Sequence, residues 1–170
     1  MFTAGNIRPF TATHSYTTTT GKESCRTESC QWASLGNFTL DGLLEESVHI
    51  GDRFSIGSAE VIVTQPRLPC YKLGIRFEAD DMVKRFFVSG RTGFYLAVAS
   101  EGEVGAGDEM RVISRDQNGV PVLEITRLYA EKRYSNADVA WVQRALRVAA
   151  LPESWKEYFR QRLEQIPTLG

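Results

Sequence analysis

Short apolar runs, each ended after a few residues by Gly, Asp or Pro, are the feature that most limits the folds open to this chain. Residues 48–50, 54–56 and 59–64 form three such runs, and β-branched side chains dominate the last of them. β-branched and aromatic residues favour strands, whereas Gly, Asp and Pro favour the turns between strands. The pattern predicts short strands joined by tight turns.

A second set of apolar runs continues this pattern later in the chain. Residues 94–98 and 110–113 flank residues 101–108, which contain three glycines and must turn. Residues 120–125 indicate one further strand. Many short strands with tight turns are typical of a small barrel or sandwich, so we predict a mainly β fold.

Two regions instead show helical periodicity. Residues 80–87 carry apolar side chains at helical spacing, with acids first and bases later, which suits the dipole of a short helix. Near the C-terminus, Ser135 and Asp138 have the spacing of a capping box, and Pro152 suits the first turn of a second helix. Two amphipathic helices need a third element to cover them, for which we expect residues 125–132.

By composition the chain divides into three parts. Residues 1–36 are rich in Thr and Ser and contain few large apolar side chains, so we expect them to be weakly ordered. Residues 37–128 carry the strand signals, and residues 129–170 carry the helical ones. We therefore predict a β domain followed by a small α-helical module.

Charge and cysteine content exclude several classes of protein. The 170 residues carry a formal net charge of −1, which argues against a nucleic-acid-binding protein. No apolar run approaches the ~20 residues that span a bilayer, and no secretory leader opens the chain. Cys25, Cys30 and Cys70 are an odd set without zinc-knuckle spacing, so a disulfide framework is not expected. We expect a soluble protein of a reducing compartment, most simply the cytoplasm, with no membrane partner.

The segment Gln65-Pro-Arg-Leu-Pro-Cys-Tyr-Lys72 carries the clearest chemical signal. Its two prolines fix the backbone and remove donors, so it is a stiff loop and not a central strand. Arg67 and Lys72 place positive charge near Cys70, which favours the thiolate, the form that attacks electrophiles or binds a soft metal. A buried cysteine that only packs is the alternative, because free cysteine is among the most buried residue types.

Arg91 is a second candidate binding residue. It lies between Gly90 and Gly93, and small neighbours let the backbone approach a ligand closely. We predict an anion contact at Arg91, with a surface or interface salt bridge as the alternative. Histidine is the usual general acid or base, but we assign no role to His14 or His49.

Several segments recur at characteristic spacing along the chain: Gln65-Pro-Arg-x-Pro-Cys-x-Lys72, Arg85-Phe86, Ser89-Gly-Arg-Thr-Gly93-x-Tyr95 and Gly105-x-Gly-Asp108, extended by Gly42-Leu43-Leu44-Glu45 and His49-Ile50-Gly51-Asp52. In order and spacing, these segments together resemble MOSC domains. Within that superfamily the chain is most similar to the bacterial 6-hydroxylaminopurine-resistance proteins, and its helical tail resembles their C-terminal 3-alpha domain. The resemblance covers roughly residues 37–166 and implies a MOSC-type β-barrel.

The resemblance also implies a chemistry. The cofactor would be the molybdenum cofactor (molybdopterin), with Cys70 as catalytic residue and thiolate ligand to molybdenum, and pyridoxal phosphate is not expected. Gln65, Arg67, Lys72 and Arg91 would hold cofactor groups or tune the thiolate. Such a protein is a molybdenum-dependent oxidoreductase that reduces N-hydroxylated bases or related N-hydroxylated small molecules. A non-catalytic carrier module for the cofactor or for sulfur, and a degenerate scaffold with an inert cysteine, are the alternatives.

Partners follow from the same resemblance. The chain has no flavin, haem or iron–sulfur signature, so we expect an external electron-donor reductase, for which the helical tail is a candidate docking surface. Motifs that precede this region in full-length members have no counterpart among residues 1–36. We expect the barrel to be incomplete at its N-terminal half. The chain would then be a shortened paralogue or the product of a gene with an internal deletion, or residues 1–36 would build a substitute for the missing part. The open edge that this leaves makes a homodimer attractive.

Overall fold

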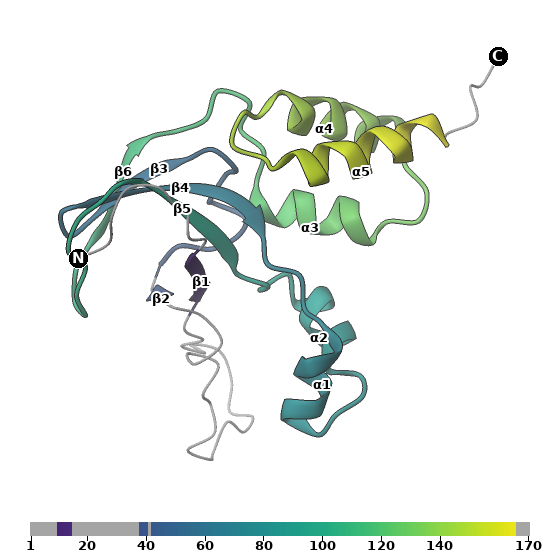
Figure 1. The fold of residues 1–170 in the computed structure, drawn as a ribbon. Coiled ribbons are helices and arrows are strands. Elements are labelled where there is room, and N and C mark those ends of the chain that lie inside the picture. Colours follow the sequence, from purple (N-terminus) through teal and green to yellow (C-terminus); the bar gives the residue numbers. More distant parts are fainter. Residues whose placement is uncertain (1–9, 15–37, 41, 166–170) are drawn as a thin grey trace.

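An open six-stranded sheet with helices beside it forms the fold (Figure 1). The structure is a computed structural model that describes residues 10–14, 38–40 and 42–165. The strands are β1 (Phe10–His14), β2 (Phe38–Leu40), β3 (Arg53–Ile56), β4 (Ala59–Pro66), β5 (Phe94–Ser100) and β6 (Met110–Ser114). They lie in the order β2-β1-β5-β4-β3-β6, and the four strands from β5 to β6 are antiparallel to their neighbours. Because β2 and β6 end the sheet without pairing to each other, the barrel is not closed.

The β3–β4 hairpin supplies much of the core of the sheet. Buried residues alternate along both strands, because neighbouring side chains point to opposite faces. Phe54 and Val63 are fully buried. The turn requires glycine at Gly57, where φ is 55° and a Cβ would lie 2.2 Å from the carbonyl oxygen of Glu103. The strands predicted at residues 54–56, 59–64, 94–98 and 110–113 are confirmed, and so is the mainly β class.

Two predicted strands are wrong. Residues 48–50 form only a single bridge, between His49 and Pro121, and residues 120–125 enter helix α3 (Val122–Ala130). Pro121 explains both differences, because it has no N–H to extend a ladder and suits the start of a helix. The fully buried apolar residues of α3 then follow the helical period: Val122, Ile125 and Leu128.

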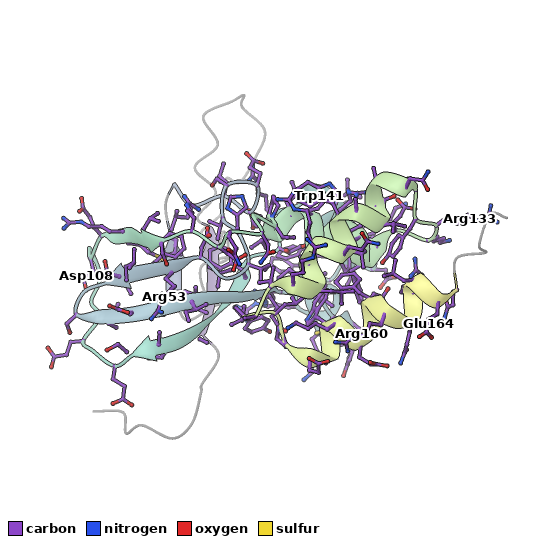
Figure 2. All side chains as sticks on the ribbon, turned by 90° about the horizontal axis from the view of Figure 1, so that it is seen from above. Arg53, Asp108, Arg133, Trp141, Arg160 and Glu164 are labelled. Carbon is purple, nitrogen blue, oxygen red and sulfur yellow. The ribbon has the colours of Figure 1, made fainter. Side chains whose placement is uncertain are left out.

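The C-terminal module consists of α3, α4 (Asn136–Arg147) and α5 (Glu153–Glu164), as predicted for a β domain followed by helices (Figures 1 and 2). The predicted capping box is present, since Ser135 Oγ accepts the Asp138 N–H and the Asp138 carboxylate accepts the Ser135 N–H. Hydrogen bonds from Ser135 and from Arg127 of α3 lower the pKa of Asp138 to about 2. None of the helices in the described part of the chain is long and apolar enough to cross a membrane.

Between β4 and β5 the chain leaves the sheet for residues 67–93, which we call the Cys70 excursion. It contains α1 (Tyr71–Phe77) and α2 (Met82–Ser89), which lie beyond the end of the sheet (Figure 1). The helix predicted at residues 80–87 is confirmed as α2, whereas α1 was not predicted. The ring of Phe87 stacks on that of Tyr129 in α3 with centroids 6.5 Å apart, so the excursion also contacts the C-terminal module.

Most of the N-terminal segment, including Cys25 and Cys30, lies outside the described residues. β1 comes from this segment and pairs with β5, so part of residues 1–36 belongs to the sheet. The domain boundaries drawn from composition stay predictions.

Candidate functional site

The Cys70 excursion is closed at its base by backbone contacts. Pro66, the last residue of β4, lies opposite Phe94, the first residue of β5. One step further out, the Arg67 N–H donates to the Gly93 carbonyl oxygen at 2.9 Å. The two ends of the excursion are therefore held side by side, and the segment that carries Cys70 starts from a fixed point.

Cys70 is the residue immediately before α1. Its backbone is extended, with φ −123° and ψ 172°, and its carbonyl accepts the Leu73 N–H at 2.9 Å. The cysteine is free and exposed. This exposure argues against a residue that only fills the core, and it leaves the sulfur accessible to a ligand.

Arg67 presents a donor that lacks an acceptor. Its Nη1 is buried without a hydrogen-bond partner among the described residues, although the residue as a whole is half-buried. A buried donor left unpaired costs about 1–3 kcal/mol, so its presence calls for a partner. Guanidinium pairs best with carboxylate or phosphate oxygens, and an anionic ligand is therefore the partner that this atom favours.

Arg91 lies in a cluster with two carboxylates. Its Nη1 is 3.4 Å from Oε2 of Glu45, and its Nη2 is 3.5 Å from Oε2 of Glu46. Glu45 is only 1% exposed, whereas Glu46 is at the surface. The structure thus gives Arg91 the salt bridge that was the alternative to an anion contact. An incoming anion would compete with both carboxylates, and a cofactor-binding role for Arg91 stays a prediction.

Gln65 and Lys72, the remaining predicted site residues, lie on either side of Arg67 and Cys70 in the chain. Gln65 is half-buried in β4 opposite Tyr95, and Lys72 is exposed in α1. The structure therefore places Arg67, Cys70 and Lys72 on one short segment, with Gln65 just before it. Their roles in binding a cofactor stay predictions.

Glu45 is the residue of this region to which sequence reasoning gave no role. Its Oε1 accepts the Gly93 N–H at 2.9 Å, so the carboxylate contacts the base of the excursion directly. The available signals were an acid that follows two leucines and its place in the Gly42-Leu43-Leu44-Glu45 segment, neither of which indicated a role for the side chain. Such an acid is ordinarily exposed, and its burial depends on segments distant in the sequence.

His49 belongs to a structural network. Its Nδ1 lies 3.3 Å from Oδ2 of the fully buried Asp52, which also accepts hydrogen bonds from Arg115 Nη1 at 2.5 Å and from the Asp116 N–H at 3.0 Å. These contacts tie the start of β3 to the chain after β6.

Among the described residues no group of three or more His, Cys, Asp or Glu could hold a metal ion. A metal bound at Cys70 would have that thiolate as its ligand from the described residues and would take its other ligands from a cofactor.

Two family models match the chain. The MOSC domain matches residues 5–111, and the YiiM-like, 3-alpha helix domain matches residues 120–165. The first match contains all six strands apart from the end of β6, together with the whole Cys70 excursion, and it begins within residues 1–36. The second match contains α3, α4 and α5, the three helices of the C-terminal module, in full.

Curated relatives are longer than this chain. The uncharacterized protein YflK of Bacillus subtilis is 38% identical over 131 residues, which are 76% of this chain and 58% of that protein. Protein YiiM of Escherichia coli is 32% identical over 126 residues, 74% of this chain and 54% of that protein. A protein of Gibberella moniliformis named reductase is 30% identical over 100 residues, 58% of this chain and 18% of that protein. The chain thus spans little more than half the length of the first two.

Solved structures show the same fold. YiiM from Geobacillus stearothermophilus superposes with a TM-score of 0.70 and 34% identity, over 75% of this chain and 64% of that one. YiiM from Escherichia coli gives a TM-score of 0.69 and 30% identity, over 81% of this chain and 69% of that one. Over the part that superposes, the fold of this chain is therefore shared with these proteins.

Proposed function

The chain belongs to the MOSC domain family and carries a YiiM-like 3-alpha helix domain, and from this premise we propose that it is a molybdenum-cofactor-binding oxidoreductase. Its substrates would be N-hydroxylated bases or related N-hydroxylated compounds, and Cys70 would bind the metal. The observation that carries the proposal is the exposed Cys70 thiol three residues after an arginine whose buried Nη1 has no hydrogen-bond partner in the described part of the chain.

The proposed reaction is a two-electron reduction. A hydroxylamine R–NHOH takes up two electrons and two protons, its N–O bond breaks, and an amine and water are released. The molybdenum cofactor, when bound, supplies a metal centre able to exchange these electrons. The electrons come from an external reductase, because the sequence has no signature of a second redox group. A relative that is itself named reductase supports redox chemistry in this family.

The described residues fit such a cofactor. A thiolate is a soft ligand and suits molybdenum, and Cys70 is exposed where a metal could reach it. Arg67 would donate its unpaired Nη1 to the phosphate of the pterin. Lys72, exposed in the first turn of α1, would add positive charge two residues after Cys70, and Gln65 would donate its amide.

Metal analysis tests the proposal. After expression in a host that makes the cofactor, the purified protein should contain molybdenum and pterin. A Cys70→Ser variant should lose the metal, whereas a Cys25→Ser, Cys30→Ser double variant, which keeps Cys70, should retain it. A parent protein that holds neither molybdenum nor pterin removes the proposal.

A carrier module is the second candidate, and the exposure of Cys70 favours it too. An exposed thiol is reachable by another protein as well as by a small substrate. Supplying a loaded sample with a chemical reductant and an N-hydroxylated purine separates the two functions. Amine formation supports the reductase, whereas cofactor transfer to an acceptor enzyme without turnover supports the carrier.

Partners and location complete the proposal. We expect the electron donor to dock on the C-terminal helices, where Arg160 and Glu164 project from α5 (Figure 2). We expect a homodimer to cover the open sheet edge, and we place the protein in the cytoplasm, where a free thiol stays reduced.

A further inference from the structure

Glu45 is a buried carboxylate that joins three separate segments. Its Oε1 accepts the Gly93 N–H at 2.9 Å, and its Oε2 lies 3.4 Å from Nη1 of Arg91. Its own backbone carbonyl accepts the N–H of Leu123, in the first turn of α3, at 2.9 Å. At 1% exposure it has almost no contact with water, so these protein groups must satisfy it. Glu45 therefore links the base of the Cys70 excursion to the C-terminal module.

The contact at Gly93 continues toward the cysteine. The Gly93 carbonyl accepts the Arg67 N–H, so Gly93 is held by Glu45 on one side and holds the start of the Cys70 segment on the other. Gly93 itself is buried, with φ at 76°, a conformation that favours glycine. From Arg67 to Cys70 the chain passes through Pro69, which limits the backbone freedom that could absorb a shift.

We propose that Glu45 is a positioning residue for the Cys70 site: its hydrogen bond to Gly93 fixes the base from which Arg67 and Cys70 project. The proposal deepens the function given above, since it rests on Cys70 as the residue that binds the cofactor. Glu45 does not touch the cofactor and acts through Gly93. A second contact joins the C-terminal module to the same residue, because the Leu123 N–H of α3 donates to the backbone carbonyl of Glu45.

Three substitutions separate the parts of this contact. Glu45→Ala removes both the acceptor for Gly93 and the charge facing Arg91. Glu45→Gln keeps an Oε1 acceptor for Gly93 and removes only the charge. Glu46→Gln is the matched control, because Glu46 shares the Arg91 ion pair but is exposed, and its substitution leaves the Glu45–Gly93 hydrogen bond in place.

Hydrogen exchange of the cofactor-free protein is the first readout. In Glu45→Ala the amides of residues 67, 68, 70 and 91–94 should exchange faster by on the order of tenfold, while those of α4 and α5 keep the parental rate; Pro69 has no amide hydrogen. Glu45→Gln and Glu46→Gln should stay close to the parent. Equal acceleration in α4 and α5 would reduce Glu45 to a general stability residue. Unchanged exchange at residues 67–70 in Glu45→Ala would overturn the proposal.

Molybdenum content and the alkylation rate of Cys70, followed by mass spectrometry of its peptide, are the second readout. Glu45→Ala should hold much less molybdenum than the parent and should alter the alkylation rate, and Glu45→Gln should restore both. Failure of Gln to restore either value, with exchange at residues 67–70 normal, would contradict positioning through Gly93. If the parent binds no molybdenum, the proposed function fails, yet exchange and alkylation still decide the role of Glu45.

Discussion

Replacing Asp138 by Asn measures how strongly the capping box and Arg127 stabilise the C-terminal module. Asp138 is 7% exposed and accepts hydrogen bonds from Ser135 and Arg127, which lower its pKa from 3.8 to about 2. A shift of nearly two units at ~1.4 kcal/mol per unit gives an upper bound of about 2.5 kcal/mol. Because the side chain of Arg127 is 43% exposed, screening by water reduces the expected contribution to about 1–2 kcal/mol.

Urea and thermal unfolding at several pH values provide the assay. A carboxyl group whose pKa is lowered by folding stabilises the protein above its ordinary pKa, and this stability is lost as the pH falls through the folded value. At pH 7, Asp138→Asn should therefore lower the free energy of unfolding by that amount, or the melting temperature by about 3–6 °C. The difference in the free energy of unfolding between the parent and Asp138→Asn should disappear as the pH falls from about 4 to about 2.

The matched control is Glu153→Gln. Glu153 is likewise an acid in the first turn of a helix and pairs with Arg160 at 2.6 Å, but its side chain is 71% exposed. Its substitution should change the stability very little, because exposed ion pairs contribute little. The reasoning would be refuted if Asp138→Asn lowered the free energy of unfolding as much at pH 2 as at pH 7. It would also be refuted if Glu153→Gln lowered the free energy of unfolding as much as Asp138→Asn does.

Further predictions concern the site, a turn and the sheet edge. Arg67→Met should lower the molybdenum content without lowering the melting temperature, since it removes a buried donor for which the described residues supply no acceptor; a matching loss of stability would contradict this. Gly57→Ala should destabilise the protein by roughly 1–3 kcal/mol in urea unfolding. Gly107→Ala, at a positive φ of 93° but with open space for a Cβ, should cost less. Light scattering should detect a homodimer that Val112→Glu weakens, because Val112 is 46% exposed on the end strand β6; an unchanged mass would exclude this edge.

Several features were determined by the sequence alone because they depend on neighbours within a few residues. The run dominated by β-branched residues predicted β4, and the Ser135 and Asp138 spacing predicted the start of α4. The two prolines around Arg67 predicted a stiff loop from Gln65 to Lys72, which is only partly right: Gln65 and Pro66 still pair in β4, residues 67–70 form the loop, and Lys72 lies in α1. Backbone preference and local hydrogen bonds decide each of these.

Other features were decided only by the tertiary structure. The apolar run at residues 120–125 indicated a strand, but a helix begins after Pro121 instead and packs its apolar side in the core. The exposure of Cys70, the ion pairs of Arg91 and the burial of Glu45 likewise have no local signature. The Glu45 carboxylate meets Gly93 across 48 positions of sequence. Burial and pairing of charge depend on which distant segments the fold brings together. Local sequence patterns could therefore identify the loop that carries the Cys70 thiol, but not the Glu45 carboxylate that holds the base of this loop.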